Sequence, residues 1–259
     1  MTNLLQQHRD DRGVVTLTMN RPEVHNALNA DLVLEFHETL RELEKDAKLR
    51  VLVITGAGEG FCSGADLVHM RKLSESGFES NLSDAHNIVE LLHTLAHFSK
   101  PTIARVNGVA YGGGLGLIAA CDMALGADDA RFSFSEIRLG LVPAVIAPYV
   151  LASMGERNAR LAMLTAEPFD AATAARWNLL QHHSKADALD ADLAHWIAAL
   201  LKGSPHAQTS CKQMIARLIE VDTATRNWTA KLNAEMRFSA EGQEGINAFL
   251  ERRKPEWRK

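Results

Sequence analysis

Residues 104–122 read A-R-V-N-G-V-A-Y-G-G-G-L-G-L-I-A-A-C-D, and this stretch decides the fold. A β-like run at 102–106 leads into the glycines 112–114, and the apolar run at 115–120 predicts a helix. Glycines between a strand and a helix allow positive φ and leave a bare backbone that a ligand can approach. Because the first amides of a helix have no partner within it, this junction suits an anion or a developing oxyanion.

Two other interpretations of this stretch stay open on these residues alone. The glycines could form an ordinary tight turn into a buried helix. They could also form a dinucleotide-binding loop, because residues 114–119 fit the G-x-G-x-x-A pattern and the acidic Glu136 follows 20 residues after Gly116. In a dinucleotide-binding domain, however, the acidic residue should end the strand directly after the helix, and that strand more naturally ends near Leu125.

A second glycine-rich loop covers residues 56–67, which read G-A-G-E-G-F-C-S-G-A-D-L. It follows the apolar run 51–56, whose pattern is typical of a strand buried on both faces. The loop could be an ordinary connection, or it could present backbone amides to a ligand. The pair Cys62-Ser63 does not favour a nucleophile, since the chain shows no G-x-S-x-G elbow and no evident base.

The remaining pattern is that of a layered α/β core followed by helices. The segments expected before residue 104 are an N-terminal hairpin ending at 14–19, a polar loop at 20–29, an amphipathic helix at 31–43, a polar and mobile connection at 70–84, and a helix at 85–96. The segments expected later are a strand at 131–134, a rigid apolar wall at 140–148, helices to about 178, a strand at 179–182, a helix at 186–201 and only helices beyond 204. His86, His93 and His97 lie near one face of the helix at 85–96, but they lack the carboxylate partners of a metal site.

Composition places the chain among ordinary globular proteins. It has 259 residues, 46% hydrophobic and 23% charged, with a formal net charge of -4. This charge argues against a nucleic-acid or anionic-membrane surface, and no apolar stretch approaches membrane-spanning length. Three cysteines without metal-ligand spacing indicate reduced thiols rather than a disulfide framework. We therefore expect a cytoplasmic protein with no nucleic-acid partner and no membrane association.

The two glycine loops and Glu136 together suggest a reaction. Two backbone amides from separate loops, converging on one point, form an oxyanion hole that could hold a thioester carbonyl as it becomes enolate-like. A carboxylate beside it could move a proton at the α or β carbon. A dinucleotide-binding domain would not need the second glycine loop.

Four motifs then occur in order along the chain. They are Asn20-Arg-Pro-x-x-x-Asn-Ala-Leu28, Phe61-x-x-Gly-Ala-Asp-Leu67, Asn107-Gly-x-Ala-x-Gly-Gly-Gly114 and Ser135-Glu-x-x-x-Gly140. In these motifs the chain resembles the crotonase superfamily, the enoyl-CoA hydratases and isomerases. The resemblance implies an α/β fold in which ββα turns form a spiral core at 1–203, followed by a helical region at 204–259 that builds a trimer or a dimer of trimers. It also implies a CoA thioester substrate, no further cofactor and no metal.

The resemblance also implies roles for individual residues. The N–H groups of Ala65 and Gly113 would form the oxyanion hole, and Glu136 matches the family's second catalytic glutamate. The residues expected to line the substrate and CoA path are His25, Ala27, Ser63, Ala65, Asp66, Leu67, Tyr111 and Gly112. The family's first catalytic glutamate is missing, because its position holds Gly116. Glu136 must then move both protons by itself, or another group must help, for which Tyr111 and Asp66 are the candidates. The alternative is an isomerisation, which needs one proton shuttle.

A finer resemblance concerns the substrate. Residues 112–117 (GGGLGL) and 136–150 (EIRLGLVPAVIAPYV) are similar to the bacterial 3-methylglutaconyl-CoA hydratase branch, which serves leucine and acyclic-terpene breakdown and also has glycine at the first glutamate position. This implies a short branched or carboxylated enoyl-CoA, with His69, Arg71 and Lys72 as candidate cations for a distal carboxylate. Solvated charges at a loop are the simpler interpretation of those cations. The alternatives are an enoyl-CoA isomerase, a nicotinamide-dependent oxidoreductase, and a non-catalytic RNA- or partner-binding protein.

Overall fold

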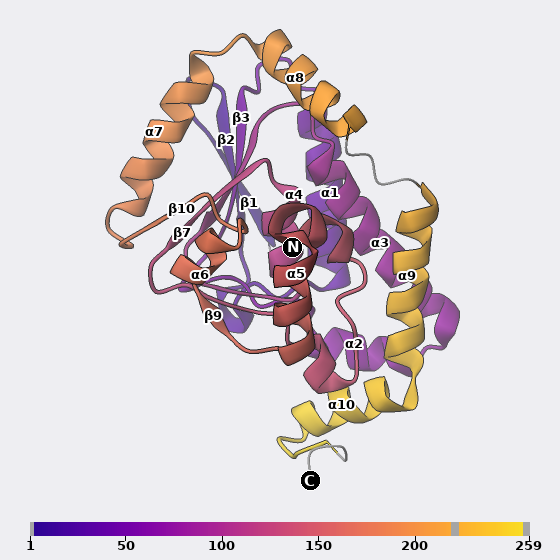
Figure 1. Ribbon diagram of the computed structural model, residues 1–259. Helices are drawn as coiled ribbons and strands as arrows, with labels where there is room; N and C mark the ends of the chain where they lie inside the picture. Colours follow the sequence, from indigo (N-terminus) through magenta and orange to yellow (C-terminus); the bar gives the residue numbers. More distant parts are fainter. Residues whose placement is uncertain (1–2, 219–222, 256–259) are drawn as a thin grey trace.

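Two mainly parallel sheets form the centre of the computed structural model, which describes residues 3–218 and 223–255 (Figure 1). The larger sheet has the order β1 (Leu5–Arg9), β2 (Val14–Met19), β3 (Val51–Gly56), β5 (Thr102–Val106), β7 (Met123–Ala127), β10 (His182–Ser184). The smaller sheet has the order β4 (Gly60–Cys62), β6 (Val109–Tyr111), β8 (Arg131–Ser133), β9 (Phe169–Asp170). The successive pairs β3–β4, β5–β6 and β7–β8 each give one strand to each sheet, which confirms the predicted spiral α/β fold.

Helices surround these sheets. They are α1 (Ala30–Glu44), α2 (Leu67–Ser74), α3 (Phe78–Ala96), α4 (Gly113–Ala120), α5 (Ala147–Thr165), α6 (Ala171–Arg176), α7 (Leu189–Leu201), α8 (Pro205–Leu218), α9 (Thr223–Phe238) and α10 (Ala240–Leu250). Two short 3-10 helices, η1 (Pro22–Val24) and η2 (Ser135–Leu139), complete the described secondary structure. None of the helices in the described ranges combines the length and the hydrophobicity that crossing a bilayer requires.

The core lies between the sheets and the helices that cover them. All six residues of β3 are buried, as expected for a strand covered on both faces. Phe36 of α1, Phe61 of β4 and Phe132 of β8 are among its largest fully buried side chains. This packing fixes the smaller sheet, whose strands lead directly into both glycine loops and into η2.

Most predicted elements are confirmed, including the N-terminal hairpin and the helix at 31–43. The expectation of a polar, mobile connection at 70–84 is wrong, because α2 and the start of α3 occupy this segment. Asp66 caps α2 by accepting hydrogen bonds from the N–H groups of Val68 and His69, and the buried Asn81 amide donates to the carbonyls of Leu73 and Gly77. The predicted strand at 179–182 is shifted and forms β10 at His182–Ser184.

The C-terminal helices pack on the body of their own chain. Helix α9 runs along α3, and α10 contacts α2 and η2 (Figure 1). These contacts bury Ala230 and Ala234 of α9 and Ile246 of α10. The C-terminal segment therefore lies against α2, which follows the glycine loop at 56–67, and against η2, which carries Glu136.

Candidate active site at the edge of the smaller sheet

Three parallel strands of the smaller sheet bring the predicted site residues together. β4 ends at Cys62, β6 at Tyr111 and β8 at Ser133, and both β4–β6 and β6–β8 are parallel pairs. Because the carboxyl ends of parallel strands meet at one edge of a sheet, the segments that follow them are neighbours. The two glycine loops and Glu136 thus share one location, as the sequence predicted.

The glycine loops touch each other at Gly64 and Gly113. A methyl group on Gly64 would lie 3.4 Å from the amide nitrogen of Gly113 and 2.8 Å from the carbonyl oxygen of Tyr111. Gly64 also has φ +92°, a conformation that side chains disfavour. Glycine at this position therefore allows the two loops to approach closely.

The Ala65 N–H points away from the segment that pairs with its loop. Leu28 and Ala65 form a parallel bridge, in which Leu28 N–H donates to Gly64 O at 2.7 Å and Asp66 N–H donates to Leu28 O at 2.9 Å. Successive peptide groups of an extended chain face opposite sides, so the Ala65 N–H faces away from Leu28. Gly113 is the first residue of α4, and its N–H accordingly has no partner within that helix.

The carboxylate of Glu136 packs against the same glycines. A methyl group on Gly112 would lie 2.9 Å from Glu136 Oε1, so this carboxylate lies directly against the backbone of the glycine. Although the residue as a whole is only half-buried, its Oε2 atom is shielded from solvent and lacks a hydrogen-bond partner among the described residues. Loss of solvation raises the pKa of Glu136 from 4.5 to about 7. Near neutral pH such a group can both accept and donate a proton.

The position of the absent first glutamate is filled by neighbouring side chains. Gly116 is buried in α4, and a methyl group on it would lie 2.3 Å from Ile146 Cγ2 and 3.4 Å from Leu92 Cδ1. Ile146, which is 1% exposed, comes from the segment before α5. A second carboxylate at position 116 is therefore sterically excluded in this structure.

The residues predicted to line the CoA path lie beside the glycine loop at 56–67. His25 is exposed and has a left-handed backbone, and its carbonyl accepts a hydrogen bond from Ser63 N–H at 2.9 Å. The Ser63 hydroxyl donates to Val24 O at 3.0 Å. Ala27 is buried and also borders this loop, because its neighbour Leu28 pairs with Ala65.

Two predicted helper groups have different surroundings. The Asp66 carboxylate is occupied, since it caps α2 and accepts a hydrogen bond from Arg21 Nη2 at 2.9 Å. Tyr111 is half-buried at the end of β6, where its register partner is Ser133 of β8. Tyr111 therefore lies nearer to the chain segment that delivers Glu136, and Asp66 serves as an anchor for α2, whose first residue is Leu67.

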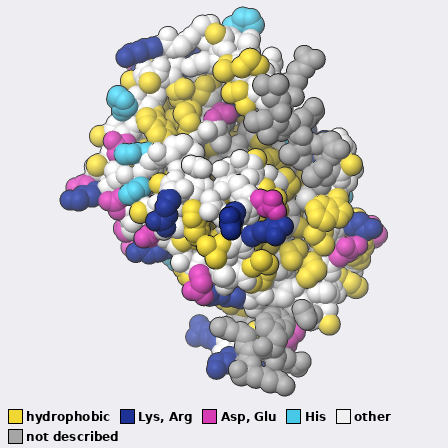
Figure 2. Space-filling model, in the orientation of Figure 1, with side chains coloured by type: hydrophobic (Ala, Val, Ile, Leu, Met, Phe, Trp, Pro, Cys, Tyr) yellow, Lys and Arg dark blue, Asp and Glu magenta, His cyan; other side chains and the backbone are white. Residues whose placement is uncertain are grey.

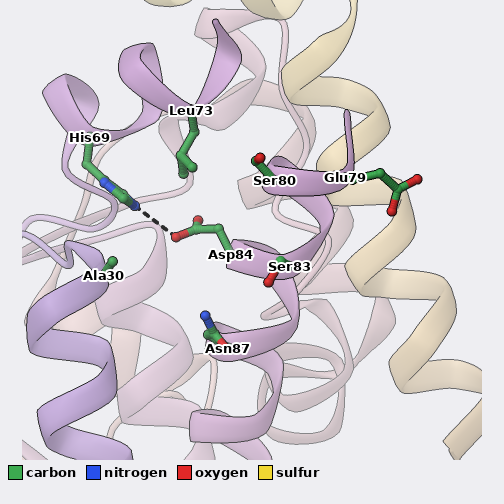
Figure 3. A pocket seen from close by; sticks show the side chains of 8 residues that line it. All are labelled: Ala30, His69, Leu73, Glu79, Ser80, Ser83, Asp84 and Asn87. Atoms are coloured by element: carbon green, nitrogen blue, oxygen red, sulfur yellow. Dashed lines mark hydrogen bonds and ion pairs between the residues drawn. The ribbon is translucent and has the colours of Figure 1, made fainter. Parts of the chain in front are cut away.

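The candidate cations of the segment after Asp66 are not equivalent. A cleft of about 440 Å³ lies between α2 and α3, and in it His69 Nε2 is 2.8 Å from Asp84 Oδ1 (Figure 3). The carboxylate of Asp84 offsets any positive charge on His69. His69 is therefore a weaker candidate than Arg71 and Lys72 to bind the distal carboxylate of a substrate. Arg71 and Lys72 are exposed on α2.

Several residues in and near the site escaped the sequence-based argument. Asn26 is fully buried, donates to Ala57 O at 2.9 Å and Gly60 O at 2.8 Å, and accepts from Arg21 N–H at 2.9 Å, so it holds the glycine loop at 56–67 in shape. Its place in the first motif was the available signal. Nothing local in the sequence signals that Ile146 covers Gly116, because that contact depends on tertiary packing.

Other chemistries find little support in this geometry. Cys62 is fully buried, and the loss of solvation raises the pKa of its thiol to about 12, which disfavours a nucleophilic thiolate. Across the described ranges, no group of three or more His, Cys, Asp or Glu side chains is arranged to hold a metal ion. Gly114 and Gly116 lie inside α4 rather than in a turn before it, and Glu136 lies in η2, well after β7. This arrangement differs from a dinucleotide-binding loop.

Comparison with known proteins agrees with the geometry. Residues 9–259 match the family described as Enoyl-CoA hydratase/isomerase. The crystal structure of an enoyl-CoA hydratase from Shewanella pealeana is 39% identical, with a TM-score of 0.81 over 98% of this chain and 96% of that one. The mevalonyl-coenzyme A hydratase sidH of Aspergillus fumigatus is 31% identical, over 95% of this chain and 91% of its own. The 2,3-dehydroadipyl-CoA hydratase of Escherichia coli is 32% identical, over 95% of each chain. The chain therefore belongs to the enoyl-CoA hydratase/isomerase, or crotonase, family.

Proposed function

We propose that this family member is a hydro-lyase that adds water to, or removes it from, a short branched or carboxylated enoyl-CoA thioester. The observation that carries this proposal is the position of Glu136. Its shielded carboxylate, with a pKa of about 7, packs on Gly112, where the two glycine loops meet. Two N–H donors and one proton carrier are the groups that this reaction needs.

In the proposed mechanism, the N–H groups of Ala65 and Gly113 donate hydrogen bonds to the thioester oxygen. A water oxygen bonds to the β carbon while the C=C electron pair moves toward the carbonyl, which gives an enolate-like oxygen. Glu136 takes a proton from this water and delivers it to the α carbon on the same face. Since Gly116 carries no carboxylate, one group performs both transfers.

For the substrate we propose 3-methylglutaconyl-CoA, interconverted with 3-hydroxy-3-methylglutaryl-CoA, as in leucine catabolism. Two of the relatives support this class through their names, because a mevalonyl group is branched and an adipyl group ends in a carboxylate. Arg71 and Lys72 are the candidate partners for the distal carboxylate. The CoA portion would lie along His25, Ala27, Asp66 and Leu67.

We also propose that the chain acts in the cytoplasm as a homotrimer, or a dimer of trimers, assembled through residues 204–259. Hydrophobic side chains lie on the surface over α9 (Figure 2). Trp228 and Phe238 of α9 and Phe249 of α10 keep 60%, 51% and 59% of their surface exposed. A subunit contact would remove such large apolar side chains from water.

The same site could support isomerisation of a double bond, because that reaction needs only one proton carrier. Of the family's two glutamate positions, this chain keeps a carboxylate at one, Glu136.

The test is to incubate the protein with 3-methylglutaconyl-CoA and with crotonyl-CoA and to follow product masses. A gain of one water on the first substrate, with little on the second, supports the hydratase. Double-bond migration at unchanged mass supports the isomerase.

The matched control for this test replaces a glutamate of the protein surface. Glu136→Gln should abolish turnover because glutamine cannot carry the proton. Glu38→Gln should leave it intact, since Glu38 is exposed in the middle of α1 and is not among the residues that line the cleft between α2 and α3. Equal turnover in Glu136→Gln and the unmodified protein would refute the proposed role of this carboxylate.

A further inference from the structure

A buried ion pair joins the C-terminal helix α9 to the body of the protein. Arg237, which is 2% exposed, donates from Nη1 to Asp84 Oδ2 at 2.6 Å. The other oxygen of Asp84 is 2.8 Å from His69 Nε2, and the His69 ring points across the cleft to Asp84 in Figure 3. One carboxylate of α3 therefore holds a side chain of α9 and a side chain of α2.

The surroundings of Asp84 favour its ionised form. Burial alone would raise the pKa of this carboxyl, yet the hydrogen bond from His69 and the charge of Arg237 lower it below its usual value. A buried carboxylate without such partners would be unfavourable. The position of α9 is thereby coupled to the position of α2.

Helix α2 in turn begins at the oxyanion-hole candidate. The His69 N–H donates to Asp66 Oδ1 at 3.1 Å, and Asp66 N–H donates to Leu28 O at 2.9 Å. Ala65 immediately precedes Asp66, so any displacement of the first turn of α2 moves the Ala65 N–H. The chain of contacts runs from Arg237 through Asp84 and His69 to this donor.

Helix α10 supports the other side of the site. A methyl group on Gly245 would lie 1.9 Å from the carbonyl oxygen of Leu139, so α10 packs directly on the end of η2, the helix that carries Glu136. Met70 of α2, Leu141 and Ile246 of α10 form a small buried apolar cluster between the two sides. The C-terminal helices thus contact both elements that would hold reacting groups.

We propose that Arg237 is a positioning residue, which acts through Asp84 and His69 to hold α2 and the Ala65 N–H at the distance that the oxyanion requires. The inference rests on the proposed function, in which Ala65 donates to the thioester oxygen. Misplacing a donor by a fraction of an ångström affects the transition state more than substrate binding, so kcat should fall while KM changes little.

The test uses a variant that leaves no unpaired buried charge, Arg237→Met combined with Asp84→Asn. Arg237→Lys is the conservative variant that keeps the positive charge. Arg253→Met is the matched control, because Arg253 likewise donates to carboxylates, those of Glu244 and Glu251, but its side chain is 42% exposed. All proteins are compared at a temperature where circular dichroism shows each of them folded.

Two readouts separate positioning from simple stabilisation. The first is kcat and KM for hydration of 3-methylglutaconyl-CoA. The second is the absorption of bound 2,4-hexadienoyl-CoA, which moves to longer wavelength when hydrogen bonds polarise its carbonyl. For the Met/Asn variant we expect a loss of about 10- to 100-fold in kcat together with a reduced wavelength shift. Arg237→Lys should recover part of both, and Arg253→Met should change neither.

The outcomes are distinguishable. A Met/Asn variant that unfolds more easily but keeps kcat and the wavelength shift would overturn the inference, because Arg237 would then be structural only. Loss of kcat with the full shift retained would overturn it as well, since the donor would not have moved. If the unmodified protein gives neither shift nor turnover, the proposed function itself fails and the inference loses its premise.

Discussion

Replacement of Glu136 by glutamine should change how the stability of the protein depends on pH. Burial raises the pKa of this carboxyl from 4.5 to about 7. One pH unit of difference corresponds to about 1.4 kcal/mol, so the ionised carboxylate costs the folded protein about 3 kcal/mol relative to the unfolded chain. Glutamine has nearly the same shape and no charge to desolvate.

The sign follows from which state ionises first. The unfolded chain releases the proton near pH 4.5 and the folded protein near pH 7, so the contribution of Glu136 to stability falls as pH rises between these values. Above about pH 7 the loss is complete. The free energy of unfolding of Glu136→Gln, minus that of the unmodified protein, should therefore grow by about 3 kcal/mol between pH 4.5 and pH 8.

Urea unfolding of both proteins at several pH values and at one fixed protein concentration measures this difference. Glu38→Gln, at an exposed glutamate in the middle of α1, is the matched control over the same range. A constant difference for Glu136→Gln would refute the reasoning, because the carboxylate would then be as well solvated in the folded state as in the unfolded one. The hydration rate offers a second check, since kcat/KM should rise with pH through a pKa near 7 as Glu136 ionises.

Three further predictions concern neighbouring structure. Gly116→Ala should lower the free energy of unfolding, measured in urea, by about 1–3 kcal/mol because the new methyl group crowds Ile146. The same substitution should be harmless in a protein that already carries Ile146→Ala, and an equal loss with and without Ile146→Ala would contradict this. Asn26→Ala should cost about 2–4 kcal/mol by removing the three hydrogen bonds of a fully buried side chain, whereas Asn158→Ala, which removes one, should cost less in the same assay. Desolvation lowers the pKa of His93 to about 4, so its neutral form is favoured and stability falls as pH drops below about 6.5. His93→Gln should move acid unfolding, followed by circular dichroism, to lower pH, and an unchanged midpoint would refute this.

Local patterns predicted the elements that position the site. The apolar run that became β3 and the glycines at the start of α4 carry their structure in their own residues, so both glycine loops could be anticipated. The segment at 70–84 misled the prediction, because its serines and charges resemble a loop. Its helices depend on the Asp66 cap and on packing against the C-terminal segment.

The properties of single groups were harder to foresee than the fold. The sequence placed Glu136 beside the glycines, but the shielding that raises its pKa depends on packing around Gly112. The pairing of Asp84 with Arg237 joins residues 153 positions apart, and no periodic pattern links them. Such contacts arise only when α3 and α9 are packed side by side.

The contact between Gly116 and Ile146 also has an evolutionary consequence. A glycine codon can become a glutamate codon through a single nucleotide change, so a second carboxylate would appear to be one mutational step away. In this protein the Cβ atom of any new side chain at position 116 would lie 2.3 Å from Ile146 Cγ2. A mutation that shortened Ile146 first would avoid this clash but would leave a cavity in the buried core. Each first step destabilises the fold by itself, so the packing of Ile146 opposes the arrival of a second carboxylate at position 116.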